Sequence, residues 1–246
     1  MSTYLLVNLL SISIPFLASF DPRLKFYRQW IYLFPAIFLT MLLFIPWDIL
    51  FTQLGVWGFN PMHLSGIHIV NLPLEEWLFF ICIPFACVFT YEALKYLVKK
   101  DYFGKYTSVI NYGLFAVLMA VALFNADKLY TSVTFILTAA FILIHQVFIK
   151  ADYLGRFYFS YLIILIPFFI VNGILTGSFI PEEVVWYDNA ENLGIRLFTI
   201  PIEDSVYGLL LLMLNTTIYE SLRKKRVNKS GLSGSPYYSH NQADNK

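Results

Sequence analysis

Charged residues are scarce in this chain. Only 13% of its 246 residues are Asp, Glu, Lys or Arg, whereas 58% are hydrophobic. An average soluble domain is about 25% charged, so the composition argues against an ordinary soluble protein and indicates that lipid is the solvent. The formal net charge is +1. It provides neither the basic field that attracts nucleic acid nor an acidic field for a cationic partner.

The sequence motifs of common cofactor and metal sites are also missing. There is no GxGxxG or Walker loop for a flavin, NAD or ATP, and no DxxxD motif for magnesium-dependent prenyl transfer. The apolar run 202–222 contains no lysine that could carry retinal as a Schiff base. His63 and His68 stand five apart in one loop, without a matching histidine in the second half of the chain. We therefore expect neither a cofactor nor a metal.

Cysteine is nearly absent as well. Cys82 and Cys87 are the two cysteines, and both fall in one apolar run. Five residues correspond to roughly 140° around a helix, so they cannot form a disulfide with each other. We interpret them as small apolar side chains that carry no information on the compartment.

Long apolar runs dominate what is present. A helix needs about 20 apolar residues to cross roughly 30 Å of hydrocarbon. Runs of about this length occur near residues 3–20, 31–51, 74–97, 107–125, 129–149, 157–177 and 202–222. The first run lacks a preceding basic segment, so we interpret it as a retained span and not as a signal peptide. The sequence predicts an all-α, polytopic integral membrane protein of about seven transmembrane helices.

The basic residues are distributed unevenly between the two sides of this arrangement. Of the 17 Lys and Arg residues, only Lys128 and Arg196 fall on the side opposite the others. Basic residues mark the cytoplasmic side of membrane proteins. The bias predicts a multi-pass protein of the cell membrane with its N-terminus outside and its C-terminus in the cytoplasm.

The chain contains an internal repeat with an offset of 128 residues. This offset aligns Gly-Ile-His-Ile at 66–69 with Gly-Ile-Arg-Leu at 194–197, and Leu-Pro-Leu-Glu-Glu at 72–76 with Ile-Pro-Ile-Glu-Asp at 200–204. Equivalent helices are four crossings apart and therefore run in the same direction, so the repeats are parallel. A pseudo-twofold axis along the membrane normal could then bring the two acidic pairs face to face.

The repeat also suggests how the chain is divided. We predict a first three-helix repeat at 1–100, a connecting helix at 101–128 and a second three-helix repeat at 129–222. Residues 223–246 are rich in Ser, Asn and Gly, and we predict that they form a disordered cytoplasmic tail.

Each acidic pair follows a proline that is suited to the start of a helix. Glu75, Glu76, Glu203 and Asp204 then fall in the first helical turns. The helix dipole stabilises an ionised acid there by about 0.3–1 kcal/mol, whereas burial can favour the protonated form by several kcal/mol. Such a site could act as a Brønsted acid, or as the proton relay of a proton-coupled membrane transporter. A plain acidic helix start is the third interpretation.

The duplicated proline-led acid pair in a small helical membrane chain resembles the lycopene cyclase domain family, in its fused two-repeat form. The resemblance covers residues 1 to about 222. It implies a cofactor-independent lycopene β-cyclase of carotenoid biosynthesis, an intramolecular lyase or isomerase. The implied partners are lycopene or a related linear carotenoid, membrane lipid and other carotenoid enzymes, with no nucleic acid.

The resemblance also suggests roles for individual residues. It makes Glu75 and Glu203 the leading candidates for the catalytic acid, with Glu76 and Asp204 as partners that tune them or accept the proton back. Aromatic faces can stabilise a carbocation, although a belt of aromatic residues at the membrane interface has the same composition. The candidate substrate-binding residues are Trp57, His68, Phe79, Trp186, Arg196 and Tyr207.

The cyclase hypothesis predicts from sequence alone that Glu203→Gln, which keeps the shape of the side chain but removes the acid, abolishes ring formation while membrane insertion persists. Pigment analysis of a lycopene-accumulating host that expresses the variant measures this. Unchanged β-carotene would refute the assignment of that residue. A transporter would instead show substrate flux that collapses with the proton gradient.

Overall fold

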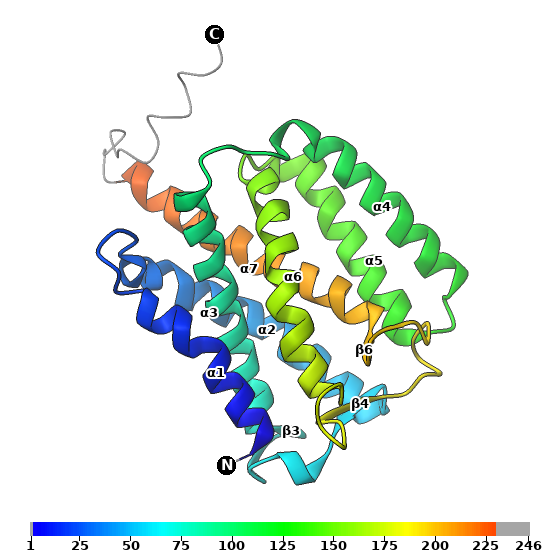
Figure 1. Cartoon of the computed structure of the whole chain (residues 1–246). Coiled ribbons are helices and arrows are strands. Elements are labelled where there is room, and N and C mark those ends of the chain that lie inside the picture. The colour runs from blue at the N-terminus through cyan, green and yellow to red at the C-terminus, as the bar shows by residue number, and fades with distance from the viewer. Residues whose placement is uncertain (1, 230–246) are drawn as a thin grey trace.

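Seven α-helices form the described part of the chain, residues 2–229 of the computed structural model (Figure 1). They are α1 (Thr3–Ala18), α2 (Trp30–Leu54), α3 (Leu74–Leu97), α4 (Thr107–Phe124), α5 (Leu129–Ile144), α6 (Leu154–Leu175) and α7 (Ile202–Lys229). Each helix corresponds to one predicted apolar run. The prediction of an all-α polytopic membrane protein is confirmed.

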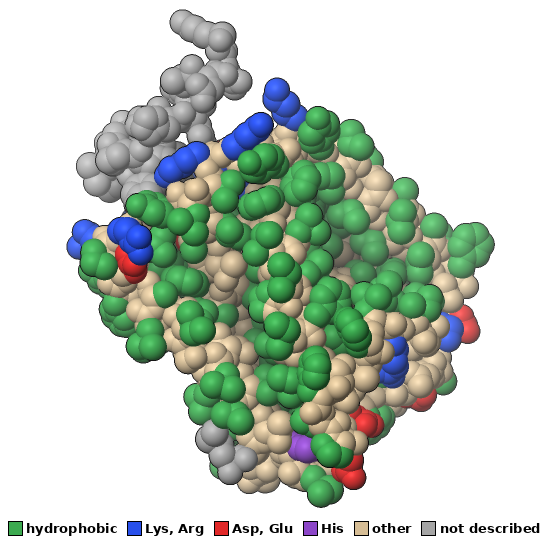
Figure 2. Space-filling model, viewed as in Figure 1, with side chains coloured by type: hydrophobic (Ala, Val, Ile, Leu, Met, Phe, Trp, Pro, Cys, Tyr) green, Lys and Arg blue, Asp and Glu red, His purple; other side chains and the backbone are tan. Residues whose placement is uncertain are grey.

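Five of the helical segments are long and apolar enough to cross a membrane by length and composition: Phe26–Leu54, Leu74–Leu97, Gly104–Phe124, Leu129–Ile149 and Leu154–Leu175. The helix α1 is apolar but shorter, with 16 residues. It packs along α3, and α7 packs along α2 and α5, so both belong to the same bundle. Hydrophobic side chains cover the face between the two ends of the molecule, and Lys and Arg line the end near the C-terminus (Figure 2).

Short elements that the sequence did not predict connect the helices. The six strands are β1 (Trp57–Phe59), β2 (His68–Ile69), β3 (Leu72–Pro73), β4 (Val185–Tyr187), β5 (Arg196–Leu197) and β6 (Ile200–Pro201). Three 3-10 turns are η1 (Phe26–Gln29), η2 (Pro61–His63) and η3 (Gly104–Tyr106), and α5 ends in a π-helical turn, η4 (His145–Ile149). The strands lie at the end of the bundle that carries the N-terminus (Figure 1).

Three helix boundaries differ from the expectation, the starts of α3 and α7 and the end of α7. Pro73 and Pro201 are the last residues of β3 and β6, so each precedes its helix instead of being the first helical residue. The helix α7 ends at Lys229, beyond the predicted limit of residue 222. The predicted tail therefore begins inside a helix, and its residues 230–246 lie outside the described part of the chain.

The helices pack as a parallel repeat requires. In the first repeat α1 packs on α3, and in the second α5 packs on α7. Across the repeats, α2 packs on α7 and α6 packs on α3. The connecting helix α4 lies against α5 at the edge of the bundle (Figure 1). This exchange of partners is the arrangement that a twofold axis between the repeats produces.

The loops before α3 and α7 have the same backbone course. Each contains a two-residue hairpin, β2–β3 or β5–β6, with antiparallel pairing. Gly66 and Gly194 have φ of 85° and 70°, a left-handed conformation that favours glycine. Val70 and Phe198, at the hairpin turns, have φ of 60° and 59°. The sequence repeat is therefore also a repeat of unusual backbone angles.

The strands β1 and β4 join the two repeats directly. Trp57 pairs with Tyr187 and Phe59 pairs with Val185, in an antiparallel register. Val-Trp-Gly-Phe-Asn at 56–60 resembles Val-Trp-Tyr-Asp-Asn at 185–189, with a shift of one residue from the repeat offset of 128. Antiparallel pairing is how equivalent strands meet across a twofold axis. Gly58 is required here, because a Cβ on it would lie 2.3 Å from the Trp186 ring.

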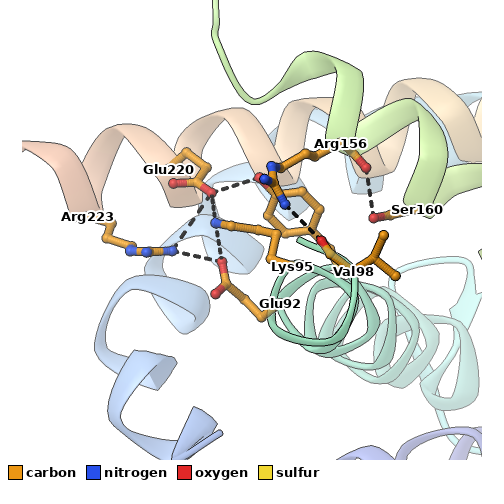
Figure 3. A network of polar contacts seen from close by, with 8 residues as sticks. Glu92, Lys95, Val98, Arg156, Ser160, Glu220 and Arg223 are labelled. Carbon is orange, nitrogen blue, oxygen red and sulfur yellow. Dashed lines mark hydrogen bonds and ion pairs between the residues drawn. The ribbon is translucent and has the colours of Figure 1, made fainter. Parts of the chain in front are cut away.

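At the opposite end of α3 and α7, four charged residues connect the repeats (Figure 3). The Lys95 ammonium lies 2.9 Å from Glu92 and 2.7 Å from Glu220, and the Arg223 guanidinium lies 2.8 Å from Glu92. Tyr91 also donates to Glu220 at 2.8 Å. The offset of 128 relates Glu92 to Glu220 and Lys95 to Arg223, so each acid contacts a base from the other repeat.

Replacing Lys95 by Met should lower the stability of the bundle. Among residues 2–229 the change leaves Arg223 as the basic ion-pair partner of Glu92 and Glu220. Removing one partner of a buried ion pair costs about 3–5 kcal/mol. The side chain of Lys95 is 21% exposed, so the lower limit applies. Thermal unfolding in detergent measures the effect, with Lys105→Met at an exposed position as control. Equal melting temperatures for the two variants would contradict a stabilising role for this network.

Candidate active site

An apolar cavity of about 370 Å³ lies between the repeats, near the end that carries the strands. Its walls come from α1, α2, α3, α5, α6 and α7 and from β1 and β4. Along α3 it extends from Glu76 to Thr90, roughly 21 Å at 1.5 Å per residue. The carboxyl groups in its lining are those of Asp48, Glu76 and Asp204. A long apolar molecule could therefore lie with one end against the acids.

Glu76 enters the cavity from the first turn of α3. The Tyr4 hydroxyl, from α1, donates a hydrogen bond of 2.5 Å to Oε2 of Glu76. The Glu76 side chain also lies in hydrogen-bonding contact with Asp48 of α2. Both acids are buried, with exposed fractions of 8% and 2%. Three helices of the first repeat thus converge on one carboxyl group.

Asp204 occupies the equivalent position in the first turn of α7. Tyr130 of α5 donates to its Oδ1 at 2.7 Å, and Tyr187 of β4 donates to its Oδ2 at 3.0 Å. Burial, followed by the adjacent Asp204 carboxylate, raises the pKa of Tyr187 well above its usual value. Tyr187 is therefore a neutral donor over the physiological range of pH.

Glu75 and Glu203 do not line the cavity but bind the loops that precede their helices. Oε1 of Glu75 accepts from the Ser2 hydroxyl at 2.7 Å and from the Ser65 N–H at 2.6 Å. Oε1 of Glu203 accepts from the Thr131 hydroxyl at 2.7 Å and from the Leu193 N–H at 2.8 Å. In both repeats this acid joins the start of the first helix to the loop before the hairpin. The geometry therefore favours a structural role for the two residues that the sequence placed first.

The predicted substrate-binding residues are divided in the same way. Trp57, Phe79 and Tyr207 line the cavity, with Trp57 and Tyr207 ring centroids 6.3 Å apart. Trp186 is 40% exposed and is not part of the lining.

The two predicted basic substrate-binding residues also lie away from the cavity lining. Arg196 donates to the Thr199 carbonyl at 2.6 Å and to the Asn189 side chain at 2.8 Å. His68 is exposed beside the Gly66 carbonyl. Both residues belong to the hairpins, and Arg196 also lies over the ring of Tyr187, a residue of the cavity lining, at 5.9 Å from the ring centroid.

Asp48 is the acid of this cavity that the sequence analysis did not select, and the tyrosines that donate to the other two acids were not selected either. Asp48 lies within the apolar helix α2, and the Trp57 indole N–H donates to its Oδ1 at 2.6 Å. An ionisable residue inside a membrane-spanning segment is costly and is a functional candidate by default. The sequence contains this signal, but the repeat does not mark it, because Thr176 stands at the position equivalent to Asp48 in the second half.

Three acids in one apolar cavity can exchange protons with a bound molecule. Neighbouring carboxyl groups share a proton when both cannot ionise, and an ionised carboxylate with hydroxyl donors can accept one. Within residues 2–229, no group of three or more His, Cys, Asp or Glu side chains is arranged to hold a metal ion. The arrangement is suited to acid–base chemistry on an apolar substrate.

The fold and the cavity define a class of protein, a polytopic helical membrane protein with acids facing an apolar cavity between two repeats. The sequence matches the family model described as lycopene cyclase over residues 1–94 and 127–222. These segments make up most of the chain, and the protein belongs to the lycopene cyclase family. It is thus an enzyme, a carotenoid cyclase of a membrane environment. No curated protein and no solved structure matches it.

The bonds of Glu203 give a prediction for stability. Glu203→Ala removes the acceptor of two buried donors, and each unsatisfied donor costs about 1–3 kcal/mol. Glu203→Gln keeps an Oε1 acceptor and should retain the melting temperature of the wild type. Thermal unfolding in detergent compares the two. Similar stability of both variants and the wild type would show that Glu203 does not hold the loop.

Proposed function

We propose that the protein is a lycopene β-cyclase, which closes β-rings at the linear ends of lycopene to give γ-carotene and then β-carotene. The observation that carries the proposal is that Glu76 and Asp204, from equivalent turns of α3 and α7, line one apolar cavity in a member of the lycopene cyclase family. The reaction is an isomerisation, an intramolecular carbon–carbon bond formation without redox change.

The chemistry begins with proton transfer from an acid to C2 of the terminal double bond. This gives a tertiary cation at C1, which the C5=C6 double bond attacks to form the C1–C6 bond. Loss of the proton from C6 then produces the β-ring. One proton is given and one is taken, so no atom is gained or lost. Carboxyl groups that alternate between acid and base fit both steps.

The cavity walls suit the cationic intermediate. Trp57, Phe79 and Tyr207 present aromatic rings near the acids, and such faces stabilise cations by about 0.5–2 kcal/mol. Water would capture the cation as an alcohol, so an apolar wall also protects the product. The extension of the cavity toward Thr90 of α3 leaves room for the polyene that follows the ring.

We further infer the same division of the chain and the same orientation as from the sequence. The first repeat is 1–100, the connecting segment is 101–128 and the second repeat is 129–222. The clustering of Lys and Arg at the end near the C-terminus supports a cytoplasmic location of that end (Figure 2). The acids then lie toward the outer side of a cell membrane, and the carotenoid enters from lipid.

Within the acid pairs we assign the chemistry to the second member of each. Glu76 and Asp204 face the cavity, whereas Glu75 and Glu203 accept hydrogen bonds from loop backbone and from hydroxyl groups. The sequence alone made Glu75 and Glu203 the leading candidates for the catalytic acid, and this assignment exchanges their roles with those of Glu76 and Asp204.

Glu76→Gln and Asp204→Asn should each reduce β-ring formation by about 100-fold or more, the contribution typical of a general acid or base. Glu75→Gln and Glu203→Gln are the matched controls and should keep ring formation, because an amide oxygen still accepts the loop hydrogen bonds. Pigment extraction from lycopene-accumulating cells, with protein levels checked in the membrane fraction, measures this. Full activity of Glu76→Gln together with loss in Glu203→Gln would reverse the assignment.

A further inference from the structure

Asp48 breaks the symmetry of the two repeats inside the cavity. The helix α6 stands to the second repeat as α2 stands to the first, yet α6 contains no Asp or Glu. Within the cavity lining, Glu76 therefore has a second carboxyl group from its own repeat, and Asp204 does not. Glu76 and Asp204 occupy equivalent positions in the two repeats, but their surroundings differ, so the same substrate would meet two chemically different acids.

The contacts of Asp48 favour a proton shared between two carboxyl groups. Its Oδ1 accepts a hydrogen bond from Trp57 and the Thr52 hydroxyl lies near the carboxyl group, but its buried Oδ2 makes no hydrogen bond of ordinary geometry among residues 2–229. Asp48 nevertheless lies in hydrogen-bonding contact with Glu76. Two ionised carboxylates have only acceptor atoms, so such a contact needs one of them to be protonated. The geometry points to a shared proton on this pair.

Asp204 has the opposite surroundings. Each of its oxygens accepts a hydroxyl hydrogen bond, from Tyr130 and from Tyr187. Donors to both oxygens favour the ionised carboxylate. The Arg196 guanidinium lies 5.9 Å from the centroid of the Tyr187 ring, so a positive charge stands beside one of these donors. One cavity therefore contains a carboxyl pair that holds a proton and a carboxylate that is prepared to take one.

We propose that Asp48 holds the proton on Glu76, that Glu76 delivers it to C2 of the carotenoid, and that Asp204 removes the proton from C6. This division of roles rests on the proposed cyclase function. Asp48 is a positioning residue, because it acts through Glu76. After the product leaves, the proton returns from Asp204 to the Asp48–Glu76 pair, so the cycle consumes no other reactant.

The pH dependence of the reaction tests the role of Asp48. The titratable and charged groups that face Glu76 are Tyr4 from α1, Asp48 from α2, Tyr187 from β4, and Asp204 and Tyr207 from α7. The four groups other than Asp48 remain in an Asp48→Asn variant. A change in the pH profile therefore reports on the missing carboxyl group.

We expect the full-length Asp48→Asn variant in liposomes with lycopene to convert lycopene at least tenfold more slowly than the wild type at pH 7. The loss should be partly recovered at lower pH, because Glu76 without its partner keeps a proton only in more acidic medium. Asp48→Glu, which restores a carboxyl group, should return toward the wild-type profile. Comparison of the three profiles is the measurement, and circular dichroism checks that each variant is folded.

A pH profile of folded Asp48→Asn that coincides with the wild-type profile would overturn the role of Asp48. A loss that is equal at every pH would do the same, because it would indicate a structural role only. Absence of cyclised product from the wild-type protein would refute the proposed function itself. The two failures are therefore distinguishable.

The same assay separates the acid from the base. Glu76→Gln should leave lycopene unconverted, because no proton reaches C2. Asp204→Asn should still consume lycopene, but the ring cation should end as an alcohol or as a ring isomer with a shifted double bond. Chromatography and mass spectrometry of the extracted carotenoids resolve these products. Unconverted lycopene with Asp204→Asn, or diverted products with Glu76→Gln, would overturn the division of roles.

Discussion

Hydrogen bonding to buried carboxyl groups is the constraint on which this structure depends. Among lipid-spanning helices no water solvates an acid, so each oxygen needs a donor from the protein or a proton of its own. The two repeats supply donors in the same way to one oxygen of Glu75 and of Glu203: Oε1 accepts from a hydroxyl and from a loop N–H. The buried Oε2 of each acid has no hydrogen-bond partner among residues 2–229, so a proton of its own would satisfy it. The bonds to Oε1 fix where α3 and α7 begin, and that in turn fixes where the next residue of each helix points.

Those next residues, Glu76 and Asp204, satisfy the same constraint with side chains that also line the cavity. Phenolic hydroxyls from α1, α5 and β4 supply the donors. A tyrosine combines a donor with an apolar ring, so it satisfies the acid without bringing water to an apolar substrate. The hydrogen-bond network and the cavity wall are therefore built from the same residues. Asp48 extends this network in the first repeat only, so the acids of the two repeats have different surroundings.

The two ends of the bundle hold the repeats together by different physical means. Near the acids, β1 and β4 share backbone hydrogen bonds, and the Trp57 ring of the first repeat packs against the Tyr130 ring of the second with centroids 5.1 Å apart. At the opposite end, Glu92, Lys95, Glu220 and Arg223 form ion pairs between α3 and α7 (Figure 3). Because the polar contacts between the repeats lie at the two ends, the middle of the bundle can be lined by apolar side chains, and the cavity extends into that part.

The sequence by itself determined the helix content, the number of helices and the internal repeat, because these follow from local hydrophobicity and from residue identity at a fixed offset. It also placed the four acids at equivalent helix starts. Only the tertiary structure decided which acid of each pair faces the cavity. Adjacent residues such as Glu75 and Glu76 project about 100° apart around a helix, so packing partners choose between them. Asp48 lies in the same cavity as Glu76 and Asp204, and β1 pairs with β4. Both arrangements bring together segments that are distant in the sequence, and no local pattern encodes such contacts.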